Sequence, residues 1–136
     1  MAMQPTVKKW ILFAEADLSA AEYLYKKPNA NQWTYLLVVW HAHQAIEKIL
    51  KALIIKKGKE LLYIHDLPKL TKLAEINMLS SQQKDFILLL NQYYLTPRYP
   101  DLPMTRSYPR ITAPQTKHIL RDTKELFLCL KNAFAD

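Results

Sequence analysis

The chain has 136 residues, half of them hydrophobic, which suits one domain with a sizeable apolar core and excludes a globally disordered protein. The one cysteine, Cys129, cannot form an intrachain disulfide, and its apolar neighbours favour a small buried hydrophobe over a nucleophile. A formal net charge of +7 would attract phosphates or an acidic protein surface, although lysines scattered along the whole chain are also typical of a solvated helical surface.

The sequence leads us to expect neither a signal peptide nor a membrane-spanning segment. Lys8 and Lys9 are followed by Glu15 and Asp17 rather than by a continuous apolar stretch. Apolar runs such as residues 36–40 have about a quarter of the roughly 20 residues that a membrane-spanning helix needs. We therefore expect a soluble, cytoplasmic protein.

Prolines and the single glycine divide the chain into helical segments, because helix interiors exclude proline and disfavour glycine. Apolar residues at intervals of three and four predict a first helix over residues 6–26, ended by Pro28. They also predict a long second helix that begins after its N-cap Asn31 and stops at Gly58. The predicted inward-facing residues are Trp10, Phe13, Ala14, Asp17, Leu18, Ala21 and Leu24 in the first helix and Trp33, Leu36, Leu37, Trp40, Gln44, Glu47, Leu50, Lys51 and Ile54 in the second.

Three more helices follow. A short one is expected over residues 68–76 with Asp66 as N-cap, and another runs from Ser80 or Ser81 to about Tyr94. Five prolines then interrupt every helical turn of residues 96–114, which predicts a long loop before a last helix over residues 115–134. The predicted fold is one all-α domain over residues 1–136, an antiparallel up-and-down bundle of four to five helices.

Familiar catalytic signatures are absent from the sequence. It has no Gly-rich phosphate loop, cysteine pair, zinc-protease motif or nucleophile elbow, and a chain with one glycine cannot build most of them. His41 and His43 are two residues apart on a helix and diverge by about 200°, so they cannot bind one metal without ligands from elsewhere. We expect no metal and no cofactor.

Polar residues interrupt the inward-facing stripe of the second helix near its middle. After Trp40 come His43, Gln44, Glu47, Lys48 and Lys51. Glu47 and Lys51 are correctly spaced for an ion pair. Such a pair either lies on the rim of the bundle, where it solvates the helix, or belongs to a buried or dimer-interface cluster with a function.

Two other segments carry candidate residues. His65 precedes the N-cap Asp66 and is placed to hydrogen-bond to backbone or to a neighbouring helix. In the Pro-rich loop, Arg98–Asp101 puts an arginine beside a tyrosine, which suits phosphate or base recognition. The same arginine could instead pin the loop to the bundle by pairing with Asp101 or Glu47.

Taken together, the order and spacing of these segments resemble those of HEPN domains. The motifs that carry the resemblance are Trp10, Ala16-Asp17-Leu18 with Ala20-Ala21, Gln44-Ala45-Ile46-Glu47-Lys48-Ile49-Leu50-Lys51-Ala52, His65-Asp66-Leu67 and Arg98-Tyr99-Pro100-Asp101. The resemblance runs from about residue 8 to residue 130. It implies a helical bundle, usually a homodimer in the prokaryotic cytoplasm, often encoded beside a minimal nucleotidyltransferase and proposed to bind nucleotide or RNA.

Some HEPN proteins are metal-independent endoribonucleases and toxins. They use an arginine followed after four to six residues by a histidine. The arginine stabilises phosphate charge, and the histidine transfers protons. This sequence departs from that motif, because no histidine stands at that distance from Arg98, Arg106 or Arg110. His118 follows Arg110 one residue too late.

The resemblance therefore favours a non-catalytic HEPN domain that binds nucleotide or RNA phosphate, or presents substrate to a nucleotidyltransferase partner, in a toxin-antitoxin-like or stress-related system. The alternative is a divergent endoribonuclease toxin that uses Arg110 and His118. In the leading interpretation, Arg98, Lys48 and Lys51 contact phosphate, and Tyr99 stacks or packs. His65 and Glu47 position the loop. The other candidate ligand-binding residues are Gln44, Asp66 and Asp101.

Overall fold

The structure is a computed structural model that describes residues 4–94 and 111–135. All regular elements in these ranges are α-helices. The helices are α1 (Pro5–Tyr25), α2 (Gln32–Lys56), α3 (Leu67–Leu73), α4 (Ser81–Asn91) and α5 (Ala113–Asn132). The all-α prediction is confirmed, with α3 and α4 each ending three residues earlier than predicted. For α3 the reason is local, since Glu75 takes a left-handed φ of 55° that a helix cannot continue through.

Side-chain caps fix the starts of the helices, because the first backbone N–H groups of a helix have no partner inside it. Asn31 Oδ1 accepts from the backbone N–H groups of Trp33 at 2.9 Å and Thr34 at 3.1 Å, as predicted for the N-cap of α2. Asp66 caps α3, and Ser80 rather than Ser81 caps α4. At the other end of α2, Gly58 has a φ of 74°, the left-handed conformation that favours glycine.

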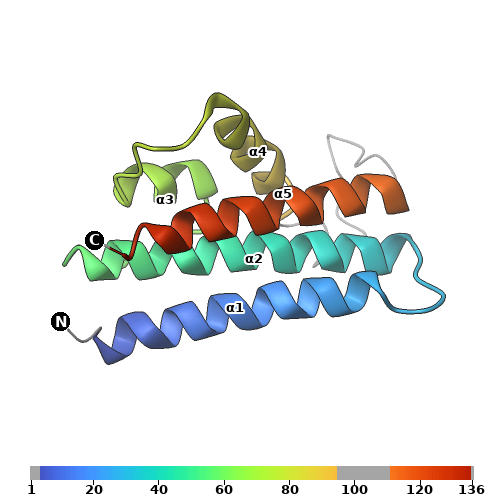
Figure 1. Ribbon diagram of the computed structural model, residues 1–136, viewed down its shortest axis with the longest axis horizontal. Coiled ribbons are helices and arrows are strands. Elements are labelled where there is room, and N and C mark those ends of the chain that lie inside the picture. Colours follow the sequence, from blue (N-terminus) through green and yellow to red (C-terminus); the bar gives the residue numbers. More distant parts are fainter. Residues whose placement is uncertain (1–3, 95–110, 136) are drawn as a thin grey trace.

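The helices α1 and α2 run antiparallel, and α5 packs beside both of them (Figure 1). Lys131 Nζ, near the end of α5, lies 2.7 Å from Glu15 Oε2 at the middle of α1, whereas Lys124 Nζ, earlier in α5, lies 3.8 Å from Glu22 Oε2 later in α1. Lys56 Nζ, at the end of α2, donates to the carbonyl oxygen of Phe134 at 3.0 Å, just beyond the end of α5. The last helix therefore runs antiparallel to α1 and parallel to α2. In the chain, α3 and α4 lie between α2 and α5.

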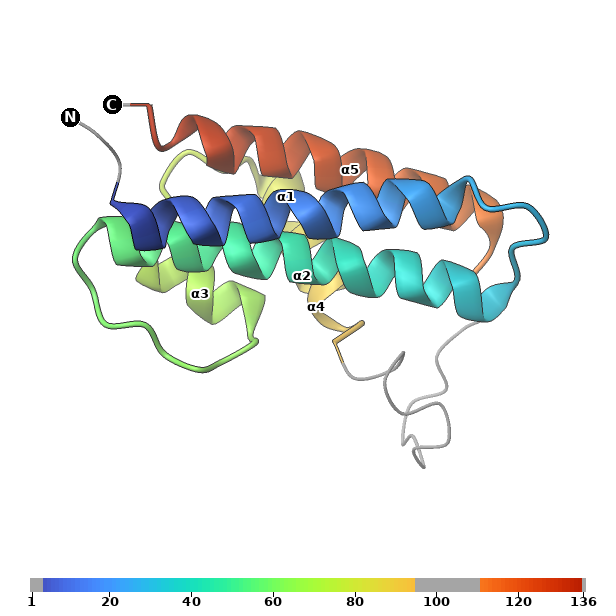
Figure 2. The same cartoon turned by 90° about the horizontal axis from the view of Figure 1, so that it is seen from below.

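The short helices α3 and α4 pack on α2, and α4 also contacts α5, while among the described residues neither contacts α1 (Figure 2). This arrangement encloses the middle of α2, which is buried without a break from residue 42 to residue 54. The largest fully buried side chains of α2 are Ile46, Ile49, Leu50, Leu53 and Ile54. None of the described helices is long and apolar enough to cross a membrane.

The α1–α2 hairpin is less completely covered than its sequence pattern predicts. Phe13, Trp33 and Leu37 were expected to face inward but are 55%, 52% and 41% exposed. Helical spacing puts Trp33 and Leu37 on the face of α2 that carries Lys48, and Phe13 lies against Lys48, so the three side chains share an edge of the hairpin. Their exposure shows that the described helices leave this edge partly uncovered. Three large apolar side chains thus remain at the surface, and one of them, Phe13, contacts the polar middle of α2.

Candidate functional site on the central helix

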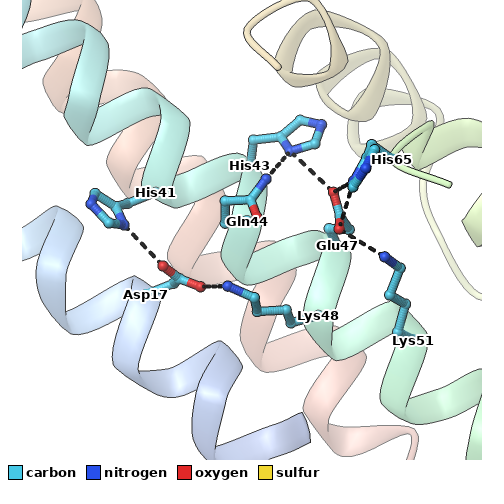
Figure 3. A network of polar contacts seen from close by, with 8 residues as sticks. All are labelled: Asp17, His41, His43, Gln44, Glu47, Lys48, Lys51 and His65. Atoms are coloured by element: carbon cyan, nitrogen blue, oxygen red, sulfur yellow. Dashed lines mark hydrogen bonds and ion pairs between the residues drawn. The ribbon is translucent and has the colours of Figure 1, made fainter. Parts of the chain in front are cut away.

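A cluster of eight polar residues lies where α2 meets α1 and the connector before α3 (Figure 3). Its members are Asp17 from α1, His41, His43, Gln44, Glu47, Lys48 and Lys51 from α2, and His65 from the connector. Helix periodicity sorts the α2 residues, since positions three, four and seven apart share a face. His41, Gln44 and Lys48 therefore lie along one line of the helix, which brings two of them to the same carboxylate on α1.

Asp17 is the centre of the first half of the cluster. Its Oδ1 lies 2.9 Å from His41 Nδ1, and its Oδ2 accepts a hydrogen bond from Lys48 Nζ. Burial of the carboxyl acts to raise the pKa of Asp17, but the hydrogen bonds from His41 and Lys48 and the lysine charge hold it below its ordinary value. The ammonium of Lys48 also lies 3.6 Å from the centre of the Phe13 ring, so an aromatic face covers the ion pair.

Glu47 is the centre of the second half. Its two oxygens each lie 3.1 Å from His65 Nδ1, and Oε2 accepts from Lys51 Nζ at 2.9 Å. Lys51 Nζ lies 5.8 Å from the centre of the Trp10 ring. The glutamate and this lysine are 3% and 4% exposed, so the ion pair is buried and the interpretation that placed it on the solvated rim of the bundle is wrong.

His43 lies between the two halves and has no exposed surface. Its Nδ1 lies 3.4 Å from Gln44 Nε2 and 3.8 Å from Glu47 Oε1 (Figure 3), so it links the two halves. Its Nε2 has no hydrogen-bond partner among the described residues. Burial lowers the pKa of His43 to about 4, against the opposing charge of Glu47, so this imidazole is neutral at physiological pH.

Two histidines form the outer edge of the cluster. The His65 ring stacks on Tyr94, with centroids 4.3 Å apart and planes 16° from parallel. The side chain of His65 is 43% exposed and that of His41 is 24% exposed. Each ring places Nδ1 against a buried carboxylate, so Nε2 is the ring nitrogen left for another partner.

Five of the predicted ligand-binding residues meet in this cluster: Gln44, Glu47, Lys48, Lys51 and His65. The predicted hydrogen bond between His65 and a neighbouring helix is thereby confirmed. Asp66 does not join them, because its carboxylate accepts from the backbone of Lys69 at the start of α3. The remaining predicted residues, Arg98, Tyr99, Asp101 and Arg110, lie outside the described residues.

His118, the histidine of the alternative ribonuclease interpretation, is exposed on α5. None of the contacts recorded for the described residues joins it to the cluster on α2. Its place in the fold therefore gives the ribonuclease interpretation no independent support.

Sequence reasoning missed Asp17 and His41 as members of the site. A usable signal was present, because Asp17 stands on the predicted inward-facing stripe of the first helix, and a buried carboxylate requires a partner. Which partner it has could not be read from spacing, since His41 and Lys48 lie 24 and 31 residues away in the chain.

The chemistry of the cluster makes it a candidate site for ligand binding. Its buried ammonium and carboxylate groups cancel in charge, and well-packed apolar side chains of similar volume would usually hold a core as well or better. A concentration of such groups is more typical of a functional site. Within the described residues, no group of three or more His, Cys, Asp or Glu side chains is arranged to hold a metal ion.

Comparisons with known proteins place the chain in a family. The crystal structure of TT1696 from Thermus thermophilus has the same fold, with a TM-score of 0.74 and 20% sequence identity over 95% of this chain and 98% of that one. A search of curated protein sequences finds no match. The profile of the HEPN domain matches residues 7–133. Since this match spans nearly the whole chain, the protein belongs to the HEPN domain family.

Proposed function

We propose that this HEPN domain binds the phosphate of a nucleotide or RNA at the α2 cluster without catalysing a reaction. The observation that carries the proposal is the presence of two buried lysine–carboxylate units, one between α1 and α2 and one within α2, each bonded to a histidine that is partly exposed. Lysine and histidine are both donors to phosphate oxygens, and the net charge of +7 would speed the approach of an anion.

The lysines retain donors for a ligand although each already has a carboxylate partner. An ammonium group has three N–H donors, and Lys48 and Lys51 each give one to a carboxylate of the cluster. Arg98 and Tyr99 remain candidates for a second contact with the ligand, as the family motif implies.

We further propose that the domain forms a homodimer and serves a nucleotidyltransferase partner in a toxin-antitoxin-like or stress-related system. The exposed Phe13, Trp33 and Leu37 support a protein contact, because a group of large apolar side chains on one edge is costly to leave in water. On α2, Trp33 and Leu37 lie along the same line as His41 and Lys48, so such a contact would border the cluster.

A binding experiment with matched lysine variants tests the phosphate site. Fluorescence anisotropy of a short labelled single-stranded RNA, with AMP as competitor, would compare wild type with Lys51→Gln and Lys124→Gln. Lys51 is buried in the cluster, whereas Lys124 is an exposed residue of α5. Both changes remove one charge, so a site predicts at least about tenfold weaker binding for Lys51→Gln alone, which corresponds to about 1.4 kcal/mol.

Equal weakening in both variants would mean that net charge alone attracts the RNA, and the proposed site would be wrong. His65→Gln supplies a second test of the cluster if Lys51→Gln does not fold. On the same samples, cleavage of a mixed RNA pool in the presence of chelator, lost in His118→Ala, would replace the binding function with the ribonuclease alternative.

A further inference from the structure

We infer that phosphate binding at the α2 cluster takes up protons, and that His41 and His65 are the residues that accept them. The inference rests on the proposed function and adds the chemical condition under which the site holds its ligand. It follows from which nitrogen of each ring faces inward.

The buried carboxylates fix the tautomers of the two outer histidines. Asp17 lies 2.9 Å from His41 Nδ1, and Glu47 lies 3.1 Å from His65 Nδ1. A carboxylate accepts only, so each Nδ1 carries a proton, and in the neutral ring the outward Nε2 then has a bare lone pair. A phosphate oxygen is also an acceptor, so neither Nε2 can hydrogen-bond to it until that nitrogen is protonated.

Charge balance leads to the same requirement. The paired carboxylates and lysines of the cluster sum to no net charge, so a phosphate brought to neutral imidazoles would meet a site without excess positive charge. Protonation of His41 and His65 adds two positive charges next to the ligand. Each imidazolium would then be stabilised from both sides, by its carboxylate and by the phosphate.

The charged and titratable groups around each ring are few. His41 faces Asp17 from α1 and Lys48, which shares that carboxylate. Its ring centroid lies 5.0 Å from that of Trp40, with the two planes 73° apart. Near His65 lie Glu47 and Lys51 from α2, the neutral His43, and the Tyr94 ring that follows α4. Each outer histidine thus has one carboxylate and one lysine beside it, and their charges cancel. Protonation of the histidine therefore makes the local net charge positive.

The test measures proton uptake during binding of a probe whose own charge is constant. A thymidine trinucleotide suits this purpose, because its phosphodiesters do not titrate between about pH 6 and about pH 8 and it lacks the 2′-hydroxyl that a ribonuclease would need. Isothermal titration of the full chain near pH 7 in two buffers of different ionisation enthalpy gives the number of protons taken up. We expect a positive number, with affinity falling by up to about tenfold per pH unit for each linked proton.

Histidine variants locate the protons. His41→Gln and His65→Gln should each reduce proton uptake and flatten the pH dependence, and the double variant should bind at all pH values as weakly as wild type does near pH 8. The control is His118→Gln on exposed α5, which should leave the pH profile unchanged. A merely structural role for His41 or His65 would lower affinity or stability without flattening this profile.

The outcomes separate the two proposals. Binding that is independent of pH and buffer would overturn the proton linkage and leave the phosphate site standing. No binding at any pH would remove both. A pH profile that flattens in His118→Gln but not in the cluster variants would assign the protons elsewhere and likewise overturn the inference; the wild-type buffer comparison decides the matter even if a variant fails to fold.

Discussion

Each buried lysine of the cluster depends on one carboxylate from a different part of the structure. Lys48 is 9% exposed and bonds to Asp17 across the α1–α2 interface, whereas Lys51 bonds to Glu47 on its own helix. The first pair therefore joins two helices, and removal of one partner leaves an uncompensated buried charge. Its contribution should be visible as stability, in contrast to the exposed pair of Lys131 and Glu15.

We expect Asp17→Asn to lower the free energy of unfolding by about 3 kcal/mol, because Lys48 loses its anionic partner. The double change Asp17→Leu with Lys48→Met should recover most of this loss, since apolar side chains of similar volume replace the pair. Chemical denaturation measures both effects, with Glu15→Gln as an exposed control that should cost less than about 1 kcal/mol. A double variant no more stable than Asp17→Asn would show that packing and not charge holds these residues.

Acid should destabilise the protein through His43. Its pKa is about 4 in the folded state against 6.5 for a free histidine, so the unfolded chain binds the extra proton first as the pH falls. Stability is then fully present above about pH 6.5 and is lost progressively towards about pH 4, by an amount on the order of 3 kcal/mol. Thermal melts over this range should show a smaller acid loss in His43→Leu, and an unchanged pH dependence in that variant would contradict the assignment.

At the scale of elements, the capping residues and the helical period were readable from the sequence, because they act within one turn of chain. Asn31, Asp66 and Gly58 lie where local rules put them. Whether a given side chain points into the core or toward solvent was less predictable. Phe13 and Trp33 fit an inward stripe by period, yet their exposure depends on which helices arrive beside them. The pairing of Asp17 with Lys48 needed the register between α1 and α2, which no local rule supplies.

The cap at the start of α2 allows a direct test of that local control. Asn31→Ala removes the acceptor for two backbone N–H groups, at Trp33 and Thr34, and should cost about 1 kcal/mol of stability. Asn31→Asp keeps an acceptor and should stay within about 0.5 kcal/mol of wild type. Urea denaturation of wild type and the two variants measures these free energies of unfolding. An equal loss of stability in both variants would count against the cap.

For the molecule as a whole, the uncovered edge of the α1–α2 hairpin bears on assembly. If it forms the proposed homodimer contact, Leu37→Glu should shift the protein to monomer, because the substitution buries a charge in an apolar interface. Tyr63→Glu is the matched control, since Tyr63 is 90% exposed on the connector before α3. Light scattering across a concentration series measures the mass; a wild type that stays monomeric would contradict the dimer proposal.

The parallel orientation of α5 and α2 has a consequence for the folding kinetics. The α1–α2 hairpin closes a short connection and can form early, whereas α5 is far from both helices in the sequence, so we expect its contacts with them to form later. Until then the pair of Asp17 and Lys48 lies in a hairpin open to water, where an ion pair contributes little. Substitutions at this pair should therefore leave the refolding rate nearly unchanged and accelerate unfolding, so that the buried charges act chiefly on the lifetime of the native state.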